Sequence, residues 1–103
     1  MADEYRILLA KRVARDLESI FERIAKASPD NAARVVARIL DAIETLKSFP
    51  HRNVVGDQSP VVKFPVRSMP GQSWMIFFRV IEQPPHVRIL RVRHGARRRL
   101  KRY

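Results

Sequence analysis

The sequence predicts an α+β domain in which a hairpin of two helices packs on one face of a mostly antiparallel sheet. Three patterns support this fold class. Apolar residues recur with a helical period between residues 10 and 49, they alternate or run together in short segments after residue 60, and one short alternating segment precedes the helices. The expected order is therefore strand, helix, helix, and then a meander of three strands, β-α-α-β-β-β.

Length and composition favour a single domain that covers residues 1–103. Hydrophobic residues form 46% of the chain, which is too many for a disordered segment. The chain contains no cysteine, which excludes a disulfide framework and a thiolate metal site. Its start has acids before a short apolar run, unlike a signal peptide or a membrane span. We expect a cytoplasmic protein that does not associate with membranes.

The first strand is predicted where Tyr5, Ile7 and Leu9 alternate with their neighbours. From Ala10 the apolar positions follow the i, i+3, i+4, i+7 rule, which predicts a helix to about Ala27. Three charge pairs at i, i+4 are expected to lie on the helix surfaces. They are Arg12 with Asp16, Glu22 with Lys26, and Asp30 with Arg34.

The second helix is predicted to begin at Ser28-Pro29. A serine hydroxyl accepts a hydrogen bond from a free amide at a helix start, and proline suits the first helical position. The helix should end near Phe49-Pro50, because a residue before proline is disfavoured in helical geometry. The two helices then form a hairpin.

Residues 51–60 are rich in turn formers and read as a loop. Val62, Phe64 and Val66 predict the next strand, which Pro65 places at an edge or a bulge. A turn over 68–73 leads to a strand over 74–81, and a second turn over 82–85 leads to the last strand, 87–93. The strand over 74–81 is apolar on both faces. With helices for only one face, we expect a partner to cover Met75 or Phe77.

Positive charge is concentrated in the second half of the chain. The formal net charge is +11; residues 1–50 hold 9 basic and 8 acidic side chains, whereas residues 51–103 hold 12 basic and 2 acidic ones. Such a field attracts nucleic acid or an acidic protein. The basic tail over 97–103 is the expected contact with phosphates or with an acidic partner. Its cations are Arg97, Arg98, Arg99, Lys101 and Arg102.

The histidines are far apart in the sequence, at His51, His86 and His94, and no pair has the spacing of metal ligands. We therefore predict neither a metal nor a cofactor.

The helical hairpin, the segment Ile76-Phe77-Phe78-Arg79-Val80 and the segment from Ile89 to Gly95 together resemble the RelE/ParE superfamily. Its members are small toxins of bacterial type II toxin–antitoxin modules, and the resemblance covers about residues 4–97. It implies a cytoplasmic toxin held inactive by an acidic antitoxin encoded beside it. We expect five residues to contact that antitoxin: Trp74, Phe77, Arg79, Arg91 and Arg93. Arg79, a charge inside an apolar strand, needs a carboxylate from Glu44, Asp41 or the antitoxin.

The last strand favours the ParE branch of this superfamily. In that branch the strand typically reads Ile-x-Arg-Val-x-His, and the segment from Ile89 to His94 has this pattern. The resemblance to ParE implies a toxin that binds and poisons DNA gyrase and that cleaves no bond.

The RelE branch, which cleaves ribosome-bound mRNA, is the alternative. Such cleavage needs proton-transfer groups and cations at the scissile phosphate. Lys63 matches the first lysine of the RelE pattern, and Arg97 followed by Tyr103 reproduces its arginine-to-tyrosine spacing; these three would be the catalytic residues. Pro65 stands where a second lysine is expected, and Met75 replaces an arginine.

Arg67, Arg98 or Arg99 could replace the missing cations of the RelE pattern. A third reading is a fold that has lost its activity and only binds the antitoxin.

Overall fold

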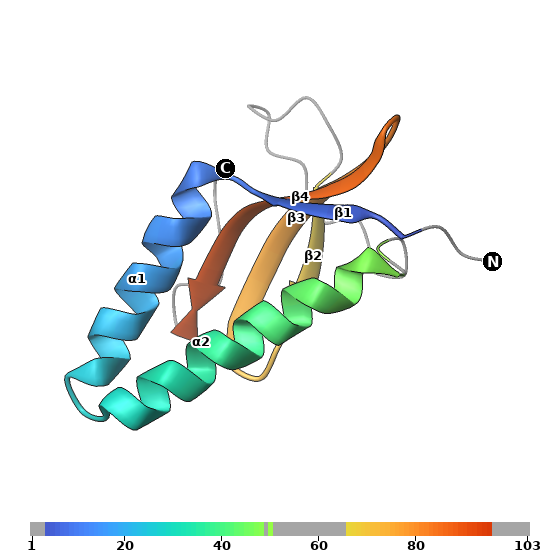
Figure 1. Cartoon of the computed structure of the whole chain (residues 1–103). Coiled ribbons are helices and arrows are strands. Elements are labelled where there is room, and N and C mark those ends of the chain that lie inside the picture. Colours follow the sequence, from blue (N-terminus) through green and yellow to red (C-terminus); the bar gives the residue numbers. More distant parts are fainter. Residues whose placement is uncertain (1–3, 49, 51–65, 96–103) are drawn as a thin grey trace.

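The computed structural model describes residues 4–48, 50 and 66–95, and its elements follow the predicted order (Figure 1). The predicted α+β class is confirmed. The elements are β1 (Arg6–Leu9), α1 (Lys11–Ala25), α2 (Pro29–Glu44), the 3-10 turn η1 (Thr45–Lys47), β2 (Arg67–Pro70), β3 (Trp74–Glu82) and β4 (Pro85–His94).

The sheet has four strands in the order β1-β4-β3-β2. The last three strands form an antiparallel meander, and β1 pairs in parallel with β4. A parallel pair needs a long connection, which here includes both helices and two strands. The first and last strands of the chain are therefore neighbours, and β1 and β2 form the two edges.

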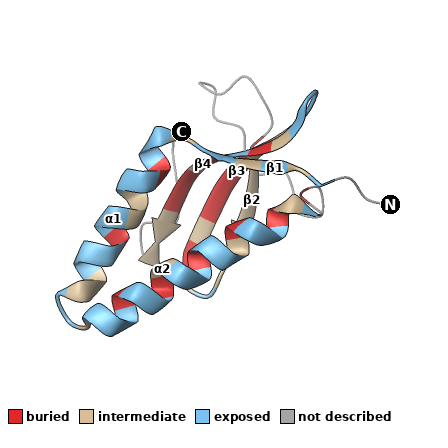
Figure 2. Ribbon diagram, viewed as in Figure 1, coloured by how far each residue is buried: buried red, intermediate tan, exposed pale blue. Residues whose placement is uncertain are grey.

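Both helices lie on the same side of the sheet (Figure 1), and their buried residues face it (Figure 2). The stripe of α1 contributes Val13 and Ile20 to the core, and α2 contributes Val35, Ile39 and Ile43. The strands supply the other half of the same cluster: Trp74, Ile76, Phe78, Val87, Ile89 and Val92.

The start of α2 is as predicted, because Ser28 Oγ accepts a hydrogen bond from the Asn31 amide at 3.2 Å and Pro29 is the first helical residue. Its end is not, since α2 stops at Glu44 rather than near residue 49. The Thr45 hydroxyl donates to the Ala42 carbonyl at 2.6 Å, and the chain tightens into η1. This turn buries Leu46. α1 likewise ends at Ala25, before the predicted residue 27.

The strand before the meander is shifted from its predicted place. β2 covers Arg67–Pro70 and so occupies part of the segment predicted to be a turn, whereas the predicted strand residues 62–65 lie outside the described part of the chain. β2 pairs with β3 from Phe78 to Met75. β2 lies at an edge of the sheet, which tolerates Pro70 because this residue has no amide to donate. Pro65, on which the prediction of an edge or a bulge depended, lies outside the described residues.

The turn between β3 and β4 is shorter than the predicted 82–85. Glu82 ends β3 and pairs with Pro85, the first residue of β4, so only Gln83 and Pro84 lie between the strands. The Tyr5 hydroxyl donates to Glu82 Oε1 at 2.7 Å and so connects the start of the chain to this end of β3.

The expectation that this chain leaves Phe77 uncovered is wrong. Phe77 is 7% exposed, and Met75 is half-buried. In the described part of the chain the exposed large hydrophobic side chains lie elsewhere, on β1 and on the helices: Leu8, Leu9, Phe21 and Leu40. No helix of the described residues is long and apolar enough to span a membrane.

Candidate functional site

A nearly buried ion pair joins α1 to β4. Arg91 Nε donates to Asp16 Oδ2 at 2.9 Å, and Arg91 Nη2 donates to Oδ1 at 3.2 Å. The two side chains are 9% and 11% exposed, respectively. The same Oδ2 accepts the backbone amide of Val92 at 2.9 Å. One carboxylate therefore satisfies a guanidinium and a main-chain donor together.

The position of Asp16 follows from the short length of β1. The last register pair between β1 and β4 is Leu9 with Ile89, and the Ala10 amide then donates to the Ile89 carbonyl at 2.9 Å. Beyond that point no described strand covers this edge of β4. Asp16 of α1 accepts the Val92 amide there, as a neighbouring strand would.

This arrangement corrects one sequence-based expectation and bears on a second, which stays a prediction. Asp16 contacts Arg91 and Val92 rather than serving as a solvated partner of Arg12. Arg91, predicted to meet an antitoxin carboxylate, already has a carboxylate partner within the chain. A signal for Asp16 exists in the sequence: it lies three residues after Val13 and four before Ile20, among the apolar positions of α1.

A β-bulge in β4 decides which arginines share a face. Phe78 pairs with Ile89 while Phe77 pairs with Arg91, so Leu90 is the extra residue. In a regular strand Arg88 and Arg93, five residues apart, would point to opposite faces. The extra residue shifts the alternation by one, and both therefore lie on the same face.

That face is the one directed away from the helices, and we call it the distal face. Paired residues share a face, so Arg88 lies opposite Arg79 and Arg93 opposite Met75. On β1, Arg6 pairs with His86 and Leu8 pairs with Arg88. The described strands direct these residues to the distal face: Arg6, Leu8, Ser68, Pro70, Met75, Phe77, Arg79, Ile81, His86, Arg88, Arg91 and Arg93.

Trp74, the other aromatic residue predicted to bind the antitoxin, lies on the helix side in the core. A Cβ atom on Gly71 would lie 2.0 Å from Trp74 Cε2, so the indole occupies the space beside this glycine. The Gly71 amide donates to the Trp74 carbonyl at 2.8 Å, which closes the turn between β2 and β3. Only glycine, which has no Cβ atom, allows this close approach.

A second polar contact joins that turn to the end of β4. Ser73 Oγ and His94 Nε2 are 3.2 Å apart, and the Gly95 amide donates to the Ser73 carbonyl at 2.7 Å. Partial burial lowers the pKa of His94 below 6.5, and the positive charge of Arg23 on α1 lowers it further. The neutral imidazole is therefore favoured near neutral pH.

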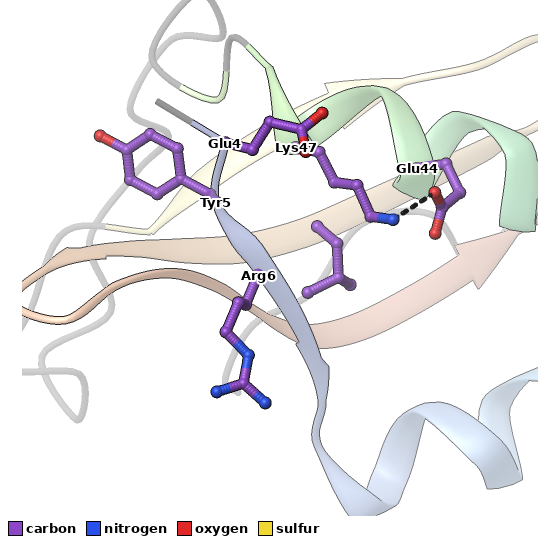
Figure 3. A pocket seen from close by; sticks show the side chains of 6 residues that line it. Glu4, Tyr5, Arg6, Glu44 and Lys47 are labelled. Atoms are coloured by element: carbon purple, nitrogen blue, oxygen red, sulfur yellow. Dashed lines mark ion pairs between the residues drawn. The ribbon is translucent and has the colours of Figure 1, made fainter. Parts of the chain in front are cut away.

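A pocket of about 490 Å³ lies between β1 and the end of α2 (Figure 3). Its walls include the ion pair of Lys47 Nζ with Glu44 Oε2, 2.9 Å apart. The hydrogen bond and then the charge of Glu44 raise the pKa of Lys47. In Figure 3 the guanidinium of Arg6 points away from this pair. In this pocket the charges of Lys47 and Glu44 therefore neutralise each other, and the Arg6 guanidinium takes no part in that ion pair.

Several predicted site residues lie outside the described part of the chain. They are Lys63, Arg97, Arg98, Arg99, Lys101, Arg102 and Tyr103. Among the described residues, no group of three or more His, Cys, Asp or Glu side chains is placed to hold a metal ion.

The fold resembles three solved toxin–antitoxin complexes. A chain of the chromosomal ParDE system from P. aeruginosa has a TM-score of 0.69 and 21% identity, over 89% of this chain and 97% of that one. A chain of the RelBE2 complex from Mycobacterium tuberculosis has a TM-score of 0.67 and 22% identity, over 91% and 94%. A chain of the archaeal RelE–RelB complex from Pyrococcus horikoshii has a TM-score of 0.59 and 15% identity, over 91% and 98%.

These likenesses concern the fold, since each identity is below one quarter. A search of curated proteins finds no significant match. The sequence itself matches a family model, that of the ParE toxin of the type II toxin–antitoxin system parDE, over residues 7–99. The match includes the helical hairpin and all four strands except the first residue of β1. The chain therefore belongs to the ParE toxin family of type II toxin–antitoxin systems.

Proposed function

We propose that this toxin inhibits DNA gyrase and that a cognate acidic antitoxin neutralises it. The observation that carries the proposal is the match to the ParE family over residues 7–99, which includes the Ile89–His94 segment with the ParE strand pattern. In this proposal the toxin acts by binding, without chemistry of its own, and needs no cofactor.

The described strands lack one cation that a RelE-type ribonuclease uses. Met75 stands at the place of the strand arginine and lies on the distal face. Arg67, a possible substitute, pairs with Phe78, which belongs to the helix-side core, so Arg67 lies on the opposite face from Met75. Loss of a donor to a charged transition state typically costs about 3–4 kcal/mol. This supports gyrase binding over phosphodiester cleavage.

One observation favours the ribonuclease as the second candidate. Arg93 lies directly opposite Met75 on the neighbouring strand, so a cation is present beside the position of the missing arginine. In this alternative Lys63, Arg97 and Tyr103 supply the remaining groups, and the partners are the ribosome and mRNA.

The proposed antitoxin has an acidic, flexible segment that folds on the toxin. Its apolar side chains would meet exposed hydrophobic residues, of which Leu8 is 42% and Leu9 50% exposed on β1, and Phe21 39% and Leu40 42% exposed on the hairpin. Its carboxylates would meet Arg79 and Arg93 on the distal face. Trp74, Phe77 and Arg91 are buried, and we propose that they support this surface from beneath.

Two assays on the purified full-length toxin test the proposal. The first measures inhibition of supercoiling by DNA gyrase, and the second measures cleavage of mRNA in a translating extract. Gyrase inhibition without cleavage supports the proposal, and cleavage without gyrase inhibition supports the ribonuclease. Inactivity in both assays, together with tight antitoxin binding, identifies a toxin fold that has lost its activity.

A further inference from the structure

Each helix of the hairpin has a second apolar stripe beside the one that it buries in the core. Both second stripes have the spacing i, i+3, i+7. Their members are Ala14, Leu17 and Phe21 on α1, and Ala33, Val36 and Leu40 on α2. Leu17 and Val36 are half-buried and the other four are exposed, Phe21 by 39% and Leu40 by 42%. We call these six residues the hairpin face.

The hairpin face lies away from the polar contacts that join the helices to the sheet. Phe21 follows Asp16 by five residues, so it lies about 140° around α1 from the side that contacts β4. On α2, Arg38 Nη1 donates to Gln72 Oε1 at 3.5 Å, in the turn between β2 and β3, and Leu40 lies about 200° around the helix from Arg38. The two helices pack against each other on one side of the sheet (Figure 1), which brings both stripes onto one surface.

The charge of α2 distinguishes this surface from the rest of the toxin. α2 holds two basic and three acidic residues, all exposed, and it is the one described element with a net negative formal charge in a chain of net charge +11. The exposed charged residues of α1 are four basic and two acidic ones, because its third acid, Asp16, is bound to Arg91. The exposed charges of the two helices therefore have opposite net sign.

We propose that the hairpin face binds the hairpin face of a second copy of this toxin when no antitoxin is bound, with α1 of each copy against α2 of the other. A two-fold axis makes such a contact with the same residues from both copies. It covers the exposed side chains of Phe21 and Leu40, and it sets the positive charge of α1 against the negative charge of α2.

A second copy fits this surface better than an acidic peptide or a nucleic acid does. At physiological ionic strength exposed charges are screened beyond about 8 Å, so local charge decides which surfaces can meet. The negative charge of α2 disfavours carboxylates and phosphates there, whereas it favours α1 of another copy. The other described elements are neutral or positive, and between two copies they attract each other less well.

Self-association and antitoxin binding exclude each other in this proposal. The proposed antitoxin places apolar side chains on Phe21 and Leu40, and these residues cannot be covered by both partners at once. The antitoxin would therefore separate the two toxin copies as it binds. This consequence rests on the proposed antitoxin contacts, whereas the self-association does not.

Sedimentation equilibrium of the nuclease-treated, full-length toxin tests the self-association over about 1–100 μM. Wild type should approach twice the mass of one chain. Phe21→Glu and Leu40→Glu should each raise the dissociation constant of the dimer more than about tenfold, because each substitution occurs twice in a two-fold contact. The matched control is Leu8→Glu, since Leu8 has the same 42% exposure as Leu40 but lies on β1.

A wild-type toxin that stays monomeric throughout this range would overturn the proposal. An equal loss in Leu8→Glu would do so too, because the contact would then include β1. The melting temperature checks folding. If a glutamate variant melts lower than wild type, Phe21→Ala or Leu40→Ala replaces it, and an unweakened dimer in both alanine variants rejects the proposal.

Two charge reversals test the arrangement of α1 against α2. Asp41→Lys and Glu22→Lys raise the net charge of the chain equally, each at an exposed position. Asp41→Lys makes α2 positive and should weaken the dimer, whereas Glu22→Lys makes α1 more positive and should not. Equal weakening in both variants would contradict this arrangement, because the dimer would then respond only to net charge.

Cross-linking measures the effect of the antitoxin. The chain has no cysteine, so a single Ala37→Cys on the exposed side of α2 reports one site. A short bismaleimide should link two copies of this variant, but not of Ser19→Cys on α1, and prior addition of the cognate antitoxin should abolish the link. A link that persists in the antitoxin complex contradicts the mutual exclusion. Neither assay contains gyrase, so their failure leaves the proposed gyrase inhibition standing.

Discussion

Arg91 of β4 and Asp16 of α1, separated by 75 residues in the sequence, form a two-bond ion pair whose carboxylate also binds the Val92 amide. The pair lies where β1 ends, at the edge of β4 opposite β3, and among the described residues no strand continues the pairing there. A helix side chain thus satisfies a strand amide, and this contact joins α1 to β4 in addition to the core packing of Val13 and Ile20. This contact makes Asp16 a structural residue of the toxin.

Replacement of Asp16 should therefore be strongly destabilising. Asp16→Ala leaves the nearly buried Arg91 guanidinium and the Val92 amide without their acceptor, and we expect a loss of about 3–5 kcal/mol in the free energy of unfolding. Urea denaturation measures it. Glu18→Ala, an exposed position on the same helix, is the control and should change stability by less than about 0.5 kcal/mol. Similar stabilities of the two variants would contradict the role assigned to Asp16.

Gly71→Ala should disturb the only tryptophan of the chain. The new Cβ would lie 2.0 Å from Trp74 Cε2, so the indole must move out of its buried site. We expect a loss of about 1–3 kcal/mol and a red-shifted tryptophan emission. Because the chain has one tryptophan, the emission spectrum reports this site alone. An emission spectrum identical to wild type would show that the turn accommodates the methyl group without moving the indole.

Stability should fall as pH decreases below about 6.5. Burial, and then the charge of Arg23, lower the pKa of His94 in the folded state, so the unfolded chain binds the proton more readily. Unfolding then takes up a proton between the lowered pKa and 6.5, and acid favours the unfolded state in that window. Above this window the contribution of His94 to the free energy of unfolding does not change with pH. Below the pKa of His94 in the folded state, this contribution has been lost completely.

Thermal melts over this pH range, compared between wild type and Arg23→Gln, measure the effect. Removing the charge of Arg23 should raise the pKa of His94 and make the melting temperature less dependent on pH. Arg15→Gln, an exposed substitution on the same helix, serves as the control. If wild type and Arg23→Gln have the same pH dependence, Arg23 does not act on His94.

Charge reversal on the distal face should weaken the antitoxin complex. Arg79→Glu or Arg93→Glu would place an acid against the proposed antitoxin carboxylates, and we expect Kd to rise more than about tenfold, or 1.4 kcal/mol. Titration calorimetry with the cognate antitoxin measures it, with Arg34→Glu as the control. Wild-type affinity in both variants would show that Arg79 and Arg93 do not contact the antitoxin. Arg91→Glu is unsuitable, because it would place a second acid against Asp16 and unfold the chain.

Deletion of residues 98–103 distinguishes the two proposed activities. The deletion removes Tyr103 and most of the basic tail, so it should abolish any RelE-type cleavage while sparing gyrase inhibition. Cleavage of mRNA in a translating extract and gyrase supercoiling provide the two measurements. Full mRNA cleavage by the shortened toxin would exclude Tyr103 as a catalytic residue.

Patterns that act within a few residues determined most of the fold from the sequence. The helical period of the apolar residues and the Ser28-Pro29 cap predicted the hairpin, and the apolar run from Trp74 predicted the central strand. Where several local signals competed, the boundaries moved. The Thr45 hydroxyl ended α2 before Pro50, and pairing with β3 placed β2 in a segment that reads as a turn.

Tertiary structure decided what no local pattern contains. The bulge at Leu90 shifts the alternation of side chains along β4 by one residue. Strict alternation would place Arg88 and Arg93 on opposite faces of the sheet, whereas in the structure they lie on the same face. Asp16 reads as a surface acid until β4 comes beside it. Local periodicity specifies which face of an element is apolar, because that depends on backbone geometry. The partner of a buried charge depends on contacts between distant segments, which exist only after the chain has folded.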